Sequence, residues 1–206
     1  MKSAHIFLSL FFIACLAQFS FGQGITGTDH DFSGRSWNSS GEICIVCHTP
    51  HNANGNVVGA PLWNHQVTGA TFTPYSSTTL DATVGQPAGN SKLCLSCHDG
   101  TVAVENYGNV TNGAELISGS ELIGTDLSND HPISFSYDAT LATNDGGLFD
   151  PTTQTSGLGG TINDDMLFAG QLECASCHDV HNGAGIGNFL RKSNASSALC
   201  LTCHNK

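Results

Sequence analysis

The feature that most constrains this chain is a five-residue pattern, Cys-x-x-Cys-His, which occurs four times, beginning at residues 44, 94, 174 and 200. The four copies contain eight of the nine cysteines: Cys44, Cys47, Cys94, Cys97, Cys174, Cys177, Cys200 and Cys203. A histidine follows the second cysteine of every copy: His48, His98, His178 and His204. Any fold of this chain must therefore present four equivalent pairs of thiols, each next to an imidazole.

The pattern is typical of c-type haem attachment, in which both thiols bond to the porphyrin and the histidine coordinates the iron. Zinc sites and disulfide frameworks also use paired cysteines. Neither requires a histidine directly after the second thiol in all four copies. The sequence therefore predicts four covalently attached c-type haems, each with one of these histidines as a proximal ligand.

The N-terminus has the pattern of a secretory signal, with Lys2 followed by an apolar run too short to span a bilayer. Small residues before Gln23 favour cleavage there, which gives a signal peptide over 1–22 and a mature domain over 23–206. Cys15 then leaves with the signal. The alternative is lipidation at Cys15, although the residues before it make a poor lipidation motif. We expect an exported protein, extracellular or at the cell surface, with the periplasm as the alternative.

The net charge excludes some classes of partner. The first 22 residues carry one lysine and no acid, so cleavage changes the formal charge from −11 to −12. Such an acidic surface disfavours nucleic acid and anionic membranes as partners. No later apolar run is long enough for a membrane span.

The composition predicts a mostly coil fold with short α-helices and few strands, wrapped around a haem stack. The chain is rich in Gly, Ser, Thr and Asn and has few long apolar stretches, so the haems would supply much of the core and the apo-protein would be unfolded. Short helices are expected just before two motifs, over 91–95 and, capped by Ser193 or Asn194, over 195–200. Residues 138–165 are interpreted as an extended surface loop with solvated acids.

A weak internal doubling relates the two halves. Residues 47–52 and 177–182 both read Cys-His-x-x-His-Asn, and each segment is followed by a further motif. The natural interpretation is two haem pairs, within approximately 23–110 and 111–206.

Each iron needs a sixth ligand or an open position. Met166 is the only methionine of the mature chain, so methionine ligation can serve one haem at most. Five histidines remain as candidates: His30, His51, His65, His131 and His181. Bis-histidine ligation throughout leaves one histidine spare, which the sequence does not name. His51 and His181 follow a proximal histidine by three residues and are expected to reach the neighbouring haem.

With these motifs the chain resembles the doubled Cys-x-x-Cys-His multihaem cytochromes, and more closely the tetrahaem subunits of extracellular cytochrome filaments. The matching segments are 42–52, 60–65, 91–103, 129–135 and 198–206. The resemblance implies head-to-tail polymers with one continuous haem stack, in which a histidine of one subunit can ligate a haem of the next. On this basis we expect His30, on its N-terminal arm, to be the ligand donated in trans.

The function predicted on these grounds is long-range electron transfer by a protein that is not an enzyme. Its partners would be copies of itself, other multihaem cytochromes and extracellular electron acceptors. Two alternatives stay open at this stage. One is a monomeric periplasmic electron shuttle, and the other is a multihaem reductase, which would need an iron with an open position.

Overall fold

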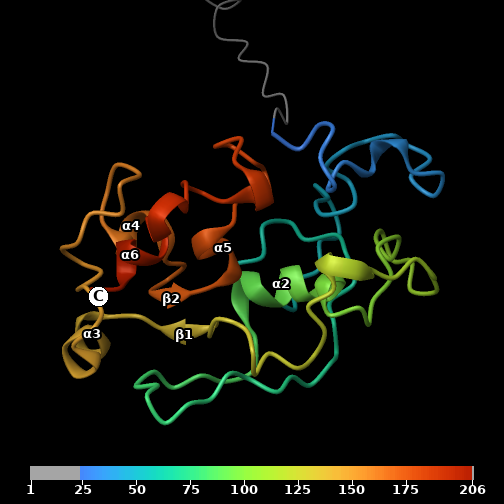
Figure 1. Ribbon diagram of the computed structural model, residues 1–206. Coiled ribbons are helices and arrows are strands. Elements are labelled where there is room, and N and C mark those ends of the chain that lie inside the picture. Colours follow the sequence, from blue (N-terminus) through green and yellow to red (C-terminus); the bar gives the residue numbers. More distant parts are fainter. Residues whose placement is uncertain (1–23, 206) are drawn as a thin grey trace, which may run out of the picture.

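The computed structural model describes residues 24–205, so the predicted signal peptide and Cys15 lie outside the described residues. Coil dominates, as predicted (Figure 1). The α-helices are α2 (Gly89–His98), α3 (Ala139–Asp145), α4 (Ile162–Met166), α5 (Cys174–Cys177) and α6 (Cys200–Cys203). Strands β1 (Phe135–Ser136) and β2 (Gln171–Leu172) form an antiparallel pair that aligns Phe135 with Leu172. Short 3-10 helices cover Phe32–Gly34, Gly119–Glu121, Gly187–Phe189 and Ala195–Ser197.

The helix expected before the second motif is α2, which begins two residues earlier than predicted, at Gly89. The helix expected after Asn194 is instead a 3-10 turn, Ala195–Ser197, followed by α6. Asn194 does not cap the 3-10 turn with its side chain; its Oδ1 instead accepts a hydrogen bond at 3.2 Å from the N–H of Leu199, the residue before α6. Both segments deliver a motif from a helical turn.

The interpretation of residues 138–165 as a surface loop was wrong. Helix α3 begins where the Asp138 carboxylate accepts a hydrogen bond from Leu141 N, and it ends at Gly146 in a left-handed conformation. Helix α4 begins with a capping box formed by Thr161 and Asp164. Two of the acids, Asp138 and Asp164, thus help to start helices, which the polar composition of the segment concealed.

These helices help to build a core that the composition did not predict. Nine buried residues, here called the C-terminal core, pack together: Phe135, Tyr137, Leu141, Ala142, Ile162, Met166, Leu167, Leu172 and Leu199. A second and smaller cluster contains Phe72, Leu95 and Leu127. The protein therefore has a substantial apolar core in its last third and much less elsewhere.

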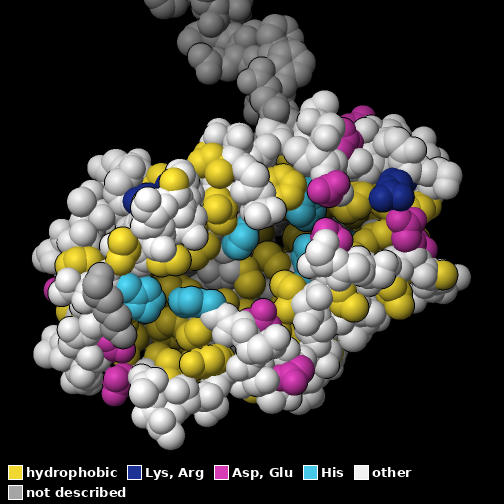
Figure 2. Space-filling view, in the orientation of Figure 1, with side chains coloured by type: hydrophobic (Ala, Val, Ile, Leu, Met, Phe, Trp, Pro, Cys, Tyr) yellow, Lys and Arg dark blue, Asp and Glu magenta, His cyan; other side chains and the backbone are white. Residues whose placement is uncertain are grey.

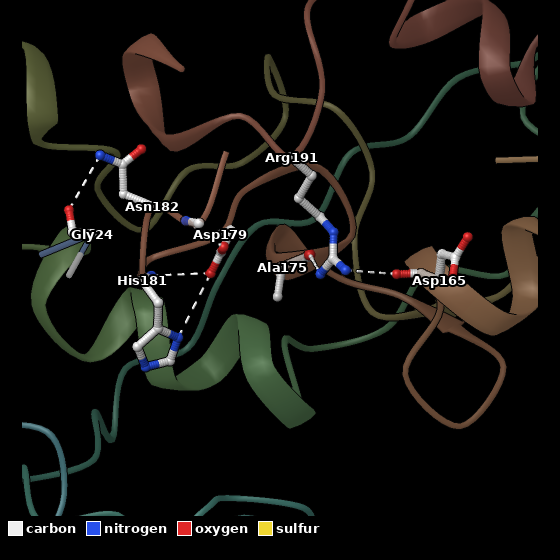
Figure 3. A network of polar contacts seen from close by, with 8 residues as sticks. Gly24, Asp165, Ala175, Asp179, His181, Asn182 and Arg191 are labelled. Atoms are coloured by element: carbon white, nitrogen blue, oxygen red, sulfur yellow. Dashed lines mark hydrogen bonds and ion pairs between the residues drawn. The ribbon is translucent and has the colours of Figure 1, made fainter. Parts of the chain in front are cut away.

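Residues far apart in the sequence join the two halves. The Asn182 side chain donates a hydrogen bond to Gly24 O at 3.2 Å, so the N-terminal segment rests on the loop after the third motif (Figure 3). Helices α2 and α5, which carry the second and third motifs, lie side by side (Figure 1). Within 24–205, no helix combines the length and apolarity required to cross a membrane.

Candidate haem-binding site

The four motifs share one local geometry. In three of them the backbone N–H of the histidine donates to the backbone carbonyl of the first cysteine, at 2.8 Å for His48, 3.1 Å for His178 and 3.0 Å for His204. The second motif occupies the last turns of α2. A single helical turn places residues three apart on one face. Both thiols of each motif can therefore bond to one flat ring.

Three of the four proximal histidines are held by a backbone carbonyl. The Nδ1 atoms lie 2.6 Å from Pro61 O for His48, 2.7 Å from Glu121 O for His98 and 2.8 Å from Asn188 O for His178. A carbonyl oxygen only accepts, so each Nδ1 carries the hydrogen and donates it. The Nε2 lone pair is then available to a metal, which is the usual arrangement of metal-binding histidines.

The structure also brings proximal histidines together with histidines predicted as distal ligands. Three imidazole pairs have ring centres between 6.0 and 6.3 Å apart: His30 with His98 at 6.0 Å, His48 with His181 at 6.1 Å, and His131 with His204 at 6.3 Å.

This separation suits two imidazoles that share an iron. A metal–imidazole bond is about 2 Å long and a ring nitrogen lies about 1 Å from its ring centre, so opposed ligands have centres about 6 Å apart. The side chains therefore fit bis-histidine haem at three of the four motifs. The His48–His181 pair joins the two halves of the chain, whereas the sequence had suggested one haem pair within each half.

Two of the distal candidates have contacts that orient their rings. His131 Nδ1 donates to Pro132 O at 2.9 Å. His181 Nδ1 lies 3.6 Å from the Asp179 carboxylate, which also accepts the backbone N–H of His181 (Figure 3). In both residues Nε2 is the nitrogen left for a metal.

The structure places His30 beside a proximal histidine of its own chain, whereas the resemblance led us to expect that it ligates a haem of another subunit. His30 faces His98 of its own chain and packs against the Phe189 ring, with centres 4.9 Å apart. Burial, together with repulsion from His98, lowers the pKa of His30 to about 4. Its Nδ1 is buried without a hydrogen-bond partner. The N-terminal arm is docked on its own chain, and the His30 side chain is half-buried there.

His65 and His51 are the two remaining histidines. His65 is 1 % exposed, and its two ring nitrogens lie 2.8 Å from Gln66 O and 3.0 Å from Ala103 O. Backbone carbonyls thus cover both nitrogens, which makes His65 the best candidate for the spare histidine. His51 is exposed, and within 24–205 neither His51 nor His178 has a histidine ring contact.

An apolar cavity adjoins the fourth motif. Cys200, Cys203, His204 and His131 line it together with side chains of the C-terminal core. Figure 2 shows histidines next to a hollow whose walls are hydrophobic. A wall of this kind suits the porphyrin face and limits the access of water to the iron.

The structure reveals a doubled loop that the sequence analysis missed. After the first motif, Thr49 N donates to Leu62 O; after the third, Asp179 N donates to Phe189 O. Leu62 and Phe189 occupy equivalent positions and share a left-handed backbone, with φ of 54° and 55°. Each follows the residue whose carbonyl holds the proximal histidine. The signal available in sequence was the repeated Asn52 and Asn182, which are also left-handed (φ 58° and 53°).

A coil-rich chain with four such motifs and imidazoles paired at this separation defines the class of a haem-binding electron-transfer cytochrome. Residues 166–206, which contain the third and fourth motifs, match the family described as the doubled CXXCH motif. This match supports a c-type cytochrome of the doubled CXXCH kind. A comparison with curated proteins finds no match for the chain.

Proposed function

We propose that this protein binds four c-type haems and conducts electrons along them without a reaction of its own. The observation that carries the proposal is the set of three imidazole pairs at 6.0–6.3 Å, each containing the histidine of an attachment motif. Such haems exchange electrons with neighbouring haems when bound. The protein contributes the axial ligands, the orientation of their rings and an apolar wall.

We assign the axial pairs as His48 with His181, His98 with His30 and His204 with His131. For the iron at His178 we propose His51. The basis is the doubling: His181 follows His178 by three residues and lies beside His48, so His51, which follows His48 by three residues, is expected to serve the iron at His178.

The ligand assignment is tested by replacing one histidine at a time and recording electron paramagnetic resonance spectra of the holoprotein. His181→Ala removes a proposed ligand, so one haem of four is expected to become high-spin. His65→Ala is the matched control and should leave all four low-spin. The number of haems is measured from the intact mass of the protein, which should correspond to four haems per chain. A high-spin haem in His65→Ala, or none in His181→Ala, would contradict the assignment.

We further propose that the protein acts outside the cell as the repeating subunit of a filament, passing electrons to an extracellular acceptor. This part depends on the resemblance to filament cytochromes. Because His30 lies against His98 of its own chain, we place the subunit contact elsewhere and require no donation from His30.

The same position of His30 favours a second candidate, a monomeric periplasmic shuttle that needs no partner to complete its ligands. Electron microscopy of material sheared from cells separates the two. Unbranched filaments containing this chain would support the conductor, and particles of monomer mass alone would support the shuttle. A high-spin haem in the unmodified protein would instead favour a reductase.

A further inference from the structure

A buried carboxylate lies between the second and third motifs. Glu173, directly before Cys174, is 3 % exposed. Its Oε2 accepts hydrogen bonds from the Ser91 hydroxyl, from the Ser134 hydroxyl at 2.9 Å and from Ser91 N at 3.3 Å. Three donors on one oxygen match an acceptor-only carboxylate. The charge is therefore fixed in place by groups that a neutral, apolar side chain could not satisfy.

The same contacts tie this charge to two attachment sites at once. Ser91, three residues before Cys94, also accepts a hydrogen bond from Cys174 N at 2.9 Å. On the other side, a Cβ added to Gly89 would lie only 2.7 Å from Glu173 Oε1, so the start of α2 closes directly over the carboxylate. Glu173 thus sits at the junction of the helices that carry the second and third motifs.

Two positive charges are fixed on the third and fourth motifs. The Arg191 guanidinium donates to Ala175 O at 3.2 Å, inside the third motif, and to Asp165 O at 2.8 Å (Figure 3). Lys192 Nζ donates to Thr202 Oγ1 at 2.9 Å, inside the fourth motif, and to Ser156 O at 2.6 Å. The chain has only six Lys and Arg residues in total, and two consecutive ones are used here.

The contacts place the charges at different motifs. Glu173 contacts the start of α2, which carries the second motif, and directly precedes the first cysteine of the third. Lys192 contacts Thr202, inside the fourth motif. The second motif therefore has a negative charge nearby and the fourth a positive one, and the third has both nearby.

We propose that Glu173 and Lys192 set the order of the haem reduction potentials, with the haem at Cys94–His98 lowered and the haem at Cys200–His204 raised. This inference rests on the proposed function, since it requires haem at both motifs. Oxidation adds a positive charge to the iron, so a nearby carboxylate stabilises the oxidised form and a nearby ammonium the reduced form. The Asp165 carboxylate, which accepts from the Ser156 hydroxyl, opposes Lys192 in part.

The arrangement gives the chain a direction. Electrons would reside preferentially on the haem at the fourth motif, which has the higher reduction potential, and least on the haem at the second motif. The haem at the third motif, between Glu173 and Arg191, would titrate between them. A buried fixed charge is screened by salt much less than a surface charge, so the effect of the buried Glu173 should persist at high ionic strength, whereas that of the half-buried Lys192 should weaken.

The test is a spectroscopic redox titration of the holoprotein. In the curve of reduced fraction against potential, Glu173→Gln should raise the potential of the last haem to be reduced and leave that of the first unchanged. Lys192→Met should lower the potential of the first haem to be reduced and leave that of the last unchanged. For each we expect about a tenfold change in the reduced-to-oxidised ratio of the affected haem at fixed potential, which is 59 mV for a one-electron couple. The double variant should give the narrowest curve.

Three controls separate charge from structure. Asp81→Asn and Arg35→Gln remove exposed charges and should leave the curve unchanged. Ser134→Ala disturbs the hydrogen bonds of Glu173 but keeps its charge, so it should not reproduce the rise seen with Glu173→Gln. If Ser134→Ala gives the same rise, Glu173 acts only as a packing residue and the inference fails for it.

Intact mass separates this inference from the proposed function. Absence of haem in the unmodified protein overturns the proposed function. Four haems in every variant with unchanged curves overturn the inference alone. Should Glu173→Gln fail to retain four haems, Lys192→Met decides by itself, because it leaves the Glu173 contacts intact, and an unshifted high-potential end would refute the ordering.

Discussion

The segment around the last motif and the segment around the first carry the same five-residue pattern in different surroundings. Behind the last motif lies the nine-residue C-terminal core, which includes the fully buried Ile162. Around the first motif, Val46 and Val57 are buried, but Val58 is 93 % exposed and Leu62 is 57 % exposed. One motif has an apolar wall made by the chain, and the other leaves apolar side chains facing outwards.

If haem attaches at both motifs, as we propose, the difference implies that attachment does not depend on an extensive protein core beside the motif. Two thioether bonds and two axial ligands fix a ring to the chain, and the ring itself buries apolar surface. Where the chain supplies its own wall, as at residues 135–172, the fold should survive loss of the ring. Where it does not, the fold should depend on it.

The largest expected effect comes from removing one haem at a time. Cys44→Ser with Cys47→Ser should leave residues 44–64 with little protection from amide hydrogen exchange. Cys200→Ser with Cys203→Ser should leave protection in α3, α4 and the β1–β2 pair. Hydrogen exchange followed by mass spectrometry measures both variants, and equal loss of protection in the two halves would remove the basis of the comparison.

A substitution in the C-terminal core should be the next most damaging. Ile162→Ala creates a cavity at a fully buried position and should lower the free energy of unfolding by about 2–5 kcal/mol. Val58→Ala, at an exposed position beside the first motif, should change it by less than about 0.5 kcal/mol. Chemical denaturation of the holoprotein measures both values; a near-neutral Ile162→Ala would mean that haem attachment, and not this core, holds the last third together.

The doubled loop offers a smaller effect with opposite signs. Leu62→Gly should stabilise the protein by about 1 kcal/mol, because glycine adopts a left-handed backbone without the cost that other residues have. Phe189→Gly gains the same relief but loses the ring contact with His30, so it should be destabilising. Thermal unfolding compares the two, and a loss of stability in Leu62→Gly would show that relief of the left-handed backbone does not outweigh the added entropy of the unfolded chain and the loss of the side chain.

The smallest effect concerns pH. The pKa of His65 is lowered below its ordinary 6.5, chiefly by burial. The unfolded chain therefore binds more protons at this residue, so stability is full above about pH 6.5 and falls as the pH drops below it. His65→Asn should flatten this slope in urea unfolding measured between pH 8 and pH 5. An unchanged slope would assign the acid sensitivity to other groups.

The sequence by itself determined the chemistry of this protein. Four motifs specify four pairs of thiols with adjacent imidazoles because attachment depends on residue type and spacing within one helical turn. The coil-rich fold also followed from composition. The nine candidate histidines could be read from the sequence, but their pairing could not, since it joins residues as distant in sequence as His48 and His181.

Tertiary structure alone decided which histidines meet and which charges lie beside which motif. His30 folds back onto His98, and His65 has its nitrogens covered by carbonyls; no local pattern distinguishes these two outcomes. The helices hidden in 138–165 needed partners such as Phe135 and Leu172 before their apolar sides had anything to pack against. Packing and ligand pairing are long-range events that the chain encodes only collectively, whereas attachment is local and can be read from five consecutive residues.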